Sequence, residues 1–188
     1  MTISTLDPTT ALLVVDLQKG FVNLPTAHPI KDVVGNTVAL LDTFRARKLP
    51  VVLINVDARA PGRSERAFST AGMPADWTEL MPELKRQASD HTVTKKSWGA
   101  FANTGLEQHL RQRGVTQVVV TGVSTSAGVE STARQAHDFG FNVTLAVDAI
   151  TDMNLEAHQN SVTRIFPRMS ETGTTRELLD LIGAGPNA

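Results

Sequence analysis

Short apolar runs without alternating polar positions constrain the fold of this sequence most. Examples are Ala11–Val15, Val51–Ile54 and the valines within Gln117–Thr121. A strand with one face in water alternates polar and apolar residues, whereas a strand buried on both faces does not. Between the runs, apolar residues recur near helical spacing, as they do within 33–49. Strands that alternate with helices predict a three-layer α/β fold with a parallel sheet and right-handed crossovers.

The bounds of the expected elements follow from these runs and from the residues that end them. Pro50 ends the first helix because proline cannot continue a helix, and Gly114 and Gly140 are placed as caps at helix C-termini. We expect strands over residues 11–15, 51–54, 91–94, 117–121 and 142–147, a short strand at 168–170, and helices over residues 33–49, 105–113, 128–139, 155–165 and 175–182. The segment 58–90 is expected to be a functional loop with one helical turn at 80–84.

Length and charge narrow the class of protein. A chain of 188 residues is expected to fold as one domain, residues 1–188, with 183–188 as a frayed tail. Its 18 basic and 19 acidic residues leave a net charge of −1, which predicts no binding to nucleic acid or to an anionic membrane. The sequence has no membrane-spanning run and no signal-peptide pattern, so we expect a cytoplasmic protein.

The residue types that the sequence lacks limit the kinds of catalysis and metal binding that it can support. There is no cysteine, which excludes disulfides, thiolate metal sites and thiol catalysis. The five histidines are scattered and show no HxH or HxxxH spacing, so a histidine metal site has no local support. We therefore expect neither a metal nor a cofactor.

Polar residues at the carboxyl ends of the expected strands are the candidates for a site. In an open α/β sheet the ligand crevice lies beyond these ends. Asp16 and Lys95 each end a strand, and the segment Gly122–Gly128 joins another strand to its helix. A carboxylate and an ammonium in one crevice are suited to acid–base chemistry, and free amides at a helix N-terminus are suited to an anion. From position alone, a non-catalytic role is favoured at each place: Asp16 as a turn residue, Lys95 as a solvated surface charge, and the serines and threonine at 124–126 as caps for helix amides.

Four segments together resemble the isochorismatase-like superfamily, which is also called the cysteine hydrolase superfamily. Leu12–Phe21 resembles the family motif D-x-Q-x-x-F, and Val147–Ala149 resembles its D-A strand end. Val93–Leu106 resembles the motif K-x-x-x-S-A-F-x-x-T-x-L, with Gly99 in place of the usual serine. Thr121–Arg134 resembles the motif T-G-V-x-T-x-x-C-V-x-x-T-A-R, with Gly128 in place of the cysteine. The resemblance runs in order over nearly the whole chain.

This resemblance implies a Rossmann-like sheet of six parallel strands in the order 3-2-1-4-5-6. It also implies a cis peptide bond between Val123 and Ser124. In most relatives an Asp–Lys–Cys triad hydrolyses amides through an acyl-enzyme, but here Gly128 stands at the cysteine position. The metal motif of the nicotinamidase branch is also missing, because Asp57–Gly62 contains no histidine.

The isochorismatase branch often has this glycine, and its enzymes cleave a vinyl ether without a nucleophilic side chain. By that resemblance, Asp16 is the general acid and Lys95 holds a substrate carboxylate or hydroxyl. A nearby ammonium lowers a carboxyl pKa, so burial or a bound substrate carboxylate must offset Lys95. The turn of this chain lacks the Tyr and His of the isochorismatase motif G-V-Y-A-H-x-G, which leaves the substrate open.

The expected site therefore combines a catalytic group with a substrate-binding wall. The catalytic positions are Asp16, Lys95 and Gly128, and the substrate-binding residues are Phe21, Arg59, Phe101, Val123, Ser124, Thr125, Ser126 and Ala127. The amides of 124–128 are expected to cradle an anion, Arg59 or Arg63 to close over the substrate, and Asp148 to support the site. We expect a homo-oligomer that hydrolyses a small carboxylate-bearing molecule. The alternatives are an inactive small-molecule-binding homologue and an amidase whose cysteine at position 128 has been replaced.

Overall fold

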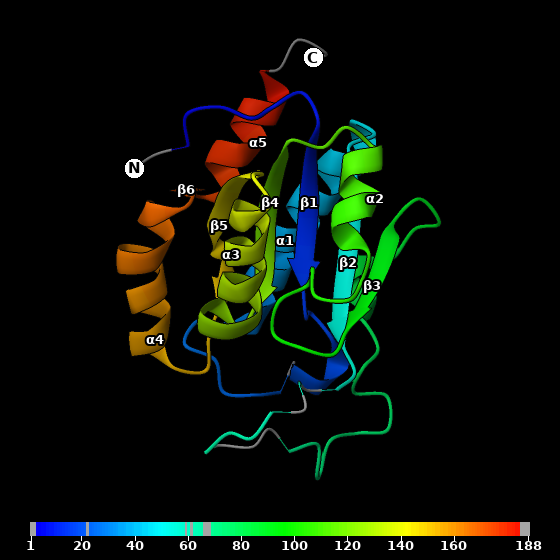
Figure 1. Ribbon diagram of the computed structural model, residues 1–188, viewed down its shortest axis with the longest axis vertical. Helices are drawn as coiled ribbons and strands as arrows, with labels where there is room; N and C mark the ends of the chain where they lie inside the picture. The colour runs from blue at the N-terminus through cyan, green and yellow to red at the C-terminus, as the bar shows by residue number, and fades with distance from the viewer. Residues whose placement is uncertain (1–2, 22, 59, 61, 66–68, 185–188) are drawn as a thin grey trace.

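Six parallel strands form one sheet in the computed structural model, which describes residues 3–21, 23–58, 60, 62–65 and 69–184. The strands are β1 (Thr10–Val15), β2 (Val51–Val56), β3 (His91–Lys95), β4 (Gln117–Val123), β5 (Asn142–Thr151) and β6 (Glu171–Gly173), and the helices are α1 (Ile30–Ala46), α2 (Leu106–Gln112), α3 (Glu130–Asp138), α4 (Leu155–Asn160) and α5 (Thr175–Gly183). The strand order is β3-β2-β1-β4-β5-β6, and every pair is parallel. The strand order implied by the resemblance is thus confirmed (Figure 1).

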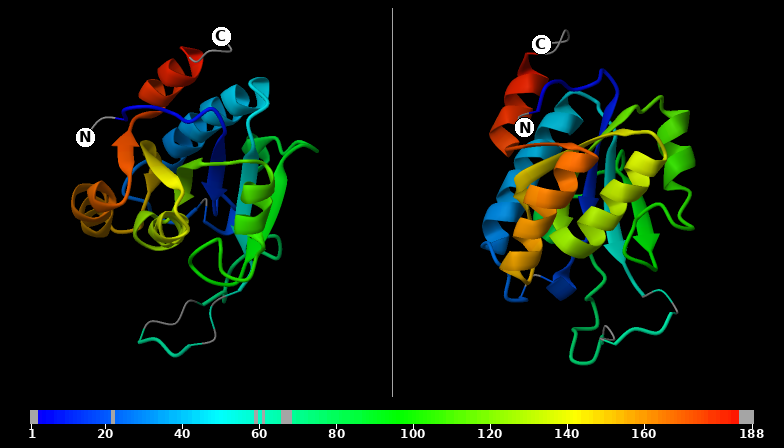
Figure 2. Two further views of the ribbon diagram at one scale, coloured as in Figure 1. Left: turned by 45° about the horizontal axis from the view of Figure 1, so that its top comes forward. Right: turned by 60° about the vertical axis from the view of Figure 1, so that its left-hand side comes forward.

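Helices cover both faces of the sheet and so make the expected three layers. On one face, Leu110 of α2, Ala133 of α3 and Phe166 after α4 belong to one buried apolar cluster. On the other face, Leu41 of α1 and Leu178 of α5 belong to a second cluster. The views in Figure 2 show α3 and α4 on one side of the strands and α1 and α5 on the other.

Strand β1 lies between these two clusters, which explains its unbroken apolar sequence. Leu12 and Val14 pack in the cluster beneath α1, whereas Leu13 and Val15 pack in the cluster beneath α3. Successive side chains of a strand point to opposite faces, so a strand covered on both sides needs apolar residues at every position.

Several element bounds differ from the sequence-based expectations. Helix α1 begins at Ile30, earlier than expected, and ends at Ala46. The short strand expected near 168–170 exists but begins later: Phe166–Arg168 is a 3-10 turn that follows α4 through a π-helical turn, and β6 begins at Glu171. Helix α5 includes Gly183 and is capped by Ala184, and residues 185–188 of the expected tail lie outside the described residues.

Strand β5 runs three residues beyond the Asp148 that was expected to end it. The cause is an irregular register against β4. Leu145 pairs with Val120, but Ile150 pairs with Gly122, so extra residues of β5 bulge between these two pairs. The bulge breaks the apolar pattern at Asp148, and the strand end moves to Thr151.

The strand order reverses between β1 and β4, and Gly122 makes the close approach there possible. Gly122 has φ +114° and lies beside Val15 in the register of these strands. A Cβ atom at Gly122 would overlap the carbonyl oxygen of Val15. The absence of a side chain therefore lets the ends of β1 and β4 meet at the place where the sheet opens a crevice.

Gly122→Ala is expected to lower the free energy of unfolding by about 3 kcal/mol or more, since the overlap is with backbone and the φ angle is unfavourable for alanine. Urea denaturation followed by circular dichroism measures the change. Gly35→Ala is the control: Gly35 is exposed within α1 with open space around it, so this change should stabilise by about 0.5–1 kcal/mol. Equal effects of the two changes would contradict the role given to Gly122.

Candidate active site

A buried ion pair lies at the carboxyl ends of the central strands. Asp16 follows β1 directly, and Lys95 is the last residue of β3. The Lys95 side chain reaches past β2, so that its Nζ lies 2.8 Å from Oδ2 of Asp16. The side chains are only 2% and 7% exposed, which makes this a buried pair with little solvent screening.

The backbone directs Asp16 inward. Its φ angle is +52°, in the left-handed region that aspartate tolerates better than most residues. Its amide donates to the carbonyl oxygen of Ile54 on β2, and its own carbonyl accepts from Gln18. The chain thus turns sharply at the end of β1 while the carboxyl group stays beneath the crevice.

One oxygen of Asp16 has a hydrogen-bond partner, and the other has none among the described residues. Oδ2 accepts from Lys95, but Oδ1 is buried without a hydrogen-bond partner among the described residues. Burial raises the pKa of Asp16 from 3.8 to about 6, while Lys95 acts in the opposite direction through its charge and its hydrogen bond. Burial outweighs the ammonium, so the carboxyl group is poised near neutral pH to carry a proton.

Lys95 has donor capacity beyond this pair. Its Nζ also donates to the carbonyl oxygen of Ser97 at 3.0 Å. An ammonium group has three N–H donors, and these two bonds use two of them in the described part of the chain. The third is available to an oxygen atom of a substrate.

Gly128 faces Asp16 from across the crevice. It is buried within a π-helical turn, Thr125–Val129, that leads into α3. A Cβ atom at Gly128 would lie 3.0 Å from Oδ2 of Asp16 and 3.2 Å from the carbonyl oxygen of Val123. A side chain at this position would therefore contact Asp16 directly. The peptide bond between Val123 and Ser124, just before the turn, is cis.

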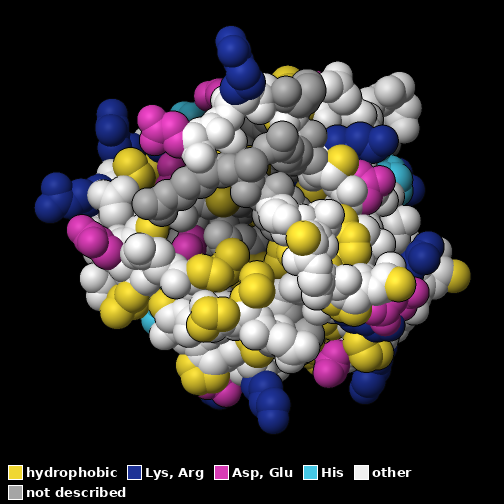
Figure 3. All heavy atoms as spheres, turned by 90° about the horizontal axis from the view of Figure 1, so that it is seen from below, with side chains coloured by type: hydrophobic (Ala, Val, Ile, Leu, Met, Phe, Trp, Pro, Cys, Tyr) yellow, Lys and Arg dark blue, Asp and Glu magenta, His cyan; other side chains and the backbone are white. Residues whose placement is uncertain are grey.

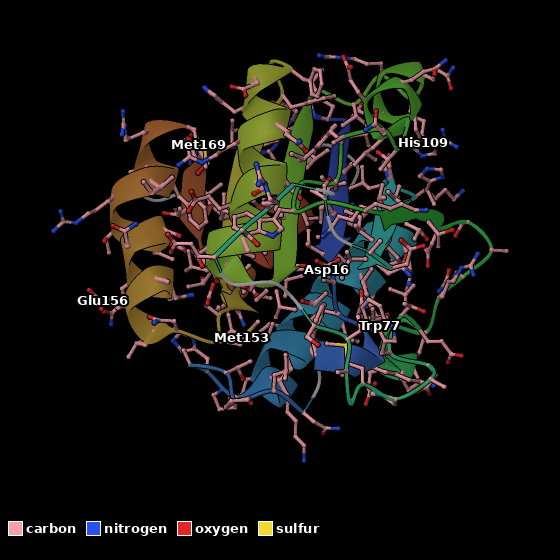
Figure 4. The ribbon with its side chains drawn as sticks, turned by 60° about the horizontal axis from the view of Figure 1, so that its bottom comes forward. Asp16, Trp77, His109, Met153, Glu156 and Met169 are labelled. Atoms are coloured by element: carbon pink, nitrogen blue, oxygen red, sulfur yellow. The ribbon has the colours of Figure 1, made fainter. Side chains whose placement is uncertain are left out.

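A pocket of about 150 Å³ opens over these three residues. Its lining residues are Asp16, Phe21, Val56, Ala58, Lys95, Ser97, Trp98, Val123, Ser124, Ala127, Gly128 and Met153. Most of this lining is apolar, and an apolar cavity of this size holds a group about as large as benzene. Figure 3 views the molecule from the carboxyl ends of the strands and shows hydrophobic side chains gathered beside a hollow. In Figure 4, Asp16 lies near the centre of this end of the molecule, with Met153 to one side.

Asp152, which the sequence analysis did not single out, holds the turn that carries Gly128. Its Oδ2 accepts from the amide of Ser126 at 2.7 Å and from the hydroxyls of Ser126 and Ser124 at 2.8 and 3.2 Å. Asp148, the expected supporting residue, is exposed and instead accepts from the amide and hydroxyl of Thr175 at the start of α5. The expectation for Asp148 is wrong, because β5 runs past it and places Asp152 at the strand end.

The expected anion cradle is also partly wrong. The amide of Ser126 is bound to Asp152, and the amide of Ala127 donates to the carbonyl oxygen of Ser124 at 3.1 Å. These two donors are used within the protein. A carboxylate directly behind the turn also disfavours a second anion in front of it.

The other expected substrate-binding residues divide into two groups. Phe21, Val123, Ser124 and Ala127 line the pocket together with the catalytic positions. Thr125, Ser126 and Phe101 lie outside the lining: Thr125 is buried against His158, Ser126 binds Asp152, and Phe101 packs against Phe139 and Phe141. Arg63 is exposed and away from the lining, and Arg59 lies outside the described residues.

His158 supports the same turn from α4. Its Nδ1 lies 2.9 Å from the hydroxyl of Thr125, and its ring is 4.6 Å from that of His28. Burial lowers the pKa of His158, His28 lowers it further, and Asp152 acts in the opposite direction. The neutral ring is thus favoured, which suits a hydrogen-bonding role within the protein.

Gln18, the glutamine of the D-x-Q motif, has a role that the motif alone did not reveal. Its buried carboxamide accepts from the amide of Val56 and donates to the carbonyl oxygens of Val56 and Trp77. It therefore fastens the end of β2 and the following loop to β1 beside the pocket. Its place two residues after Asp16 is the signal that could have identified it.

Trp98 and Met153 were also missed, and both are unusually exposed for large apolar residues. Trp98 is 68% exposed and Met153 is 46% exposed, and both line the pocket. Periodicity cannot locate such residues because they lie on loops, after β3 and after β5.

No three histidine, aspartate or glutamate side chains in the described part of the chain are grouped closely enough to hold a metal ion. No helix in it combines the length and the apolar character needed to cross a bilayer.

Comparisons with known proteins extend these observations. The sequence matches the model of the isochorismatase domain over residues 10–177. It is 40% identical over 180 residues to the isochorismatase family protein YwoC of Bacillus subtilis, covering 92% of this chain and 94% of that protein. It is 28% identical over 196 residues to the isochorismatase of Bacillus subtilis, covering 96% of this chain and 60% of that protein. A solved structure of an isochorismatase family protein from Burkholderia thailandensis superimposes with a TM-score of 0.92 at 36% identity, over 97% of this chain and all of that chain.

A thiol introduced by Gly128→Cys is expected to react readily, because Asp16 lies beside it and can accept its proton. It would be the single cysteine of the chain, so labelling is specific. At pH 7, iodoacetamide should alkylate it about tenfold faster than the thiol introduced by Ala127→Cys, which lines the same pocket. Mass spectrometry of the intact protein measures both rates. Equal rates, or a rate that Asp16→Asn leaves unchanged in the Gly128→Cys protein, would refute the placement of Gly128 against Asp16.

Proposed function

The chain belongs to the isochorismatase family and is a hydrolase of that family, and we propose that it cleaves a small enol ether without a covalent intermediate. In this proposal Asp16 donates the proton and Lys95 holds a substrate oxygen. The carrying observation is the raised pKa of a buried carboxyl group whose Oδ1 has no partner in the described part of the chain.

The nature of position 128 supports a reaction without an acyl-enzyme. Gly128 offers no nucleophilic atom, and the chain contains no cysteine. An enol ether needs no nucleophilic side chain, because protonation of its carbon produces an oxocarbenium ion that water captures. The hemiketal then collapses to a ketone and an alcohol, and the proton lost by the water restores the acid on Asp16. The net reaction consumes one water molecule and cleaves the enol ether to a ketone and an alcohol.

The oxygen of Asp16 that has no partner in the described part of the chain supports its role as the proton donor. A proton on Oδ1 leaves Oδ2 bonded to Lys95, so the ion-pair contact survives the transfer. The carboxyl group lines a largely apolar pocket, where the neutral acid is favoured over the anion. The remaining N–H of Lys95 is suited to a carboxylate or hydroxyl of the substrate, and the relationship to an isochorismatase makes isochorismate the first compound to test.

The substrate is further limited by size. The apolar lining contributed by Phe21, Trp98 and Met153 is suited to one ring or a short chain, and the pocket volume is about 150 Å³. We therefore propose one small molecule as the partner of this site. We also propose a cytoplasmic location and a homo-oligomeric assembly, both carried over from the sequence expectations.

Isochorismate is expected to be hydrolysed by the unmodified protein, with kcat/KM highest below pH about 6 and falling about tenfold per pH unit above it. The rate falls as pH rises because Asp16 must be protonated to act as an acid. Its raised pKa keeps it protonated up to about pH 6. Release of pyruvate, followed in a coupled assay, measures the rate. A rate that instead rises through pH 6 would show that Asp16 acts as a base.

Asp16→Asn is expected to lower kcat by a factor of about 10² to 10⁴, the usual contribution of one acid–base group. Because the change leaves Lys95 buried without its partner, the melting temperature must be measured alongside activity. Asp148→Asn removes the same charge from an exposed position that does not line the pocket and should keep full activity. Failure of the unmodified protein to turn over isochorismate would exclude this vinyl ether as the substrate.

A further inference from the structure

We propose that a second cavity, at the amino ends of β1, β2 and β3, binds a small phosphate dianion, either free or as a phosphate monoester. The cavity has a volume of about 480 Å³ and lies at the opposite end of the sheet from the pocket beside Asp16 (Figure 1). Its lining residues are Thr9, Arg45, Lys48, Leu49, Pro50, Val51, Ser89, Asp90 and Arg113. The two cavities share no lining residue, so this site is independent of the proposed function.

The charges that line the second cavity are mainly positive. Asp90 is the one carboxylate among its described lining residues, and Arg45 neutralises it by donating from Nε to Oδ1 at 3.2 Å and from Nη2 to Oδ2 at 2.7 Å. The Asp90 side chain is 1% exposed, and its Oδ2 also accepts from the amide of Gln87 at 2.7 Å. Lys48 and Arg113 therefore remain as two cations that no lining carboxylate balances.

Lys48 and Arg113 also keep donors for a ligand. No salt bridge or side-chain hydrogen bond joins Lys48 to another described residue. Nη1 of Arg113 lies 3.2 Å from Nδ1 of His109, and the rest of the guanidinium group has no partner in the described part of the chain. Both side chains are exposed, so they can turn toward a bound anion. The hydroxyls of Thr9 and Ser89, likewise unpartnered among the described residues, are two more donors at this cavity.

The backbone at Lys48 is in a conformation that favours glycine. Lys48 follows Arg47, the C-cap residue of α1, and its φ angle is +57°. Helices commonly end with glycine in this left-handed region, because a Cβ atom raises the energy there. A strained residue that lines a cavity indicates that its side chain has a function. An ammonium group without a carboxylate partner indicates that the function is to bind an anion.

Two histidines beside Arg113 help to place its charge. The rings of His91 and His109 are stacked, with their centroids 3.5 Å apart. Burial lowers the pKa of His91, and Arg113 lowers it further. Burial lowers the pKa of His109 to about 4, and both His91 and Arg113 act in the same direction. The neutral ring of His109 can therefore accept from Arg113, which holds the guanidinium group at the edge of the cavity.

The C-termini of α1 and α2 lie near this cavity and oppose an anion, but the cations outweigh them. A helix C-terminus carries about half a negative charge, which acts only within its last turn. Lys48 and Arg113 each contribute one full positive charge after the end of a helix. The balance at the cavity is thus positive.

A phosphate group matches these donors in charge and in number of acceptors. It carries nearly two negative charges above pH 7 and presents at least three acceptor oxygens. The cavity is larger than the pocket of about 150 Å³ beside Asp16, and Leu49, Pro50 and Val51 add apolar surface to it. This additional space is suited to the organic part of a monoester, so we expect ribose 5-phosphate to bind more tightly than inorganic phosphate.

Titration with inorganic phosphate and with ribose 5-phosphate at pH 8, followed by phosphorus NMR, measures the two dissociation constants. Both ligands should bind the unmodified protein, and an excess of ribose should displace neither of them. Raising the salt concentration from about 10 mM to about 100 mM shortens the Debye length from about 30 Å to about 10 Å and should weaken both.

The double variant Lys48→Gln with Arg113→Gln removes both unbalanced cations. It should weaken the binding of ribose 5-phosphate about tenfold, the combined effect of two exposed ion pairs. The matched control is the double variant Lys31→Gln with Arg164→Gln, which removes the same charge from exposed positions outside the cavity. The control should change the dissociation constant by less than about twofold, because salt screens distant charges.

Lys48→Gly separates a binding role from a structural one. Glycine relieves the left-handed backbone, so the melting temperature without ligand should rise. Loss of the ammonium group should at the same time weaken the binding of ribose 5-phosphate about threefold. A merely structural role of Lys48 would leave the affinity unchanged or move it together with stability.

Two outcomes would overturn the proposal. The first is that neither phosphate ligand binds the unmodified protein at low salt. The second is that the Lys48 and Arg113 double variant binds ribose 5-phosphate as tightly as the control does, since the anion would then bind elsewhere, as at Lys95. Equal affinities for the two ligands would support the site with free phosphate as its occupant. Because no measurement uses turnover, these outcomes are distinguishable from a failure to hydrolyse an enol ether.

Discussion

The buried pair of Lys95 and Asp16 is the interaction on which the site depends. It joins the end of β3 to the end of β1 across the intervening β2, with 2.8 Å between Nζ and Oδ2. Removing two charges from water is costly, and their attraction repays the cost only when geometry and additional hydrogen bonds are good. Here Lys95 has a second bond to Ser97, but Asp16 keeps one oxygen without a partner among the described residues. The protein therefore stabilises the pair incompletely, and the residue with the unsatisfied oxygen, Asp16, lines the pocket.

Much of the fold was predictable because burial on both faces leaves a clear pattern. Strands β1 to β4 and the layer arrangement follow from apolar runs and helical periodicity, and the strand order was implied by the resemblance and is confirmed. The end of β5 was not predictable, because a bulge against β4 disturbs the apolar pattern at Asp148. The short β6 was misplaced for a related reason: three residues carry too little pattern to fix a position.

The candidate site was predictable in its parts but not in its connections. Asp16, Lys95 and Gly128 lie together as their places at strand ends suggested, although their roles stay proposals. The function of Asp152 depends on side-chain contacts between β5 and the β4–α3 turn, which no local motif encodes. For Phe101 the error is the reverse: its motif lies near the site, but its ring is buried with Phe141 in the apolar core and also contacts the exposed Phe139.

The glycine at 128, together with the lack of cysteine elsewhere, has a consequence for the chemical durability of the site. Thiolates are the side chains that peroxides and alkylating agents attack first, and oxidation beyond the sulfenic acid is largely irreversible. The mechanism proposed for this hydrolase uses a carboxyl group and an ammonium, and it presents no such target. The sulfur atom in its pocket lining is the thioether of Met153, at the exposed rim, whose sulfoxide is reversible. The glycine that excludes thiol catalysis would thus also free the proposed reaction from the redox state of its surroundings.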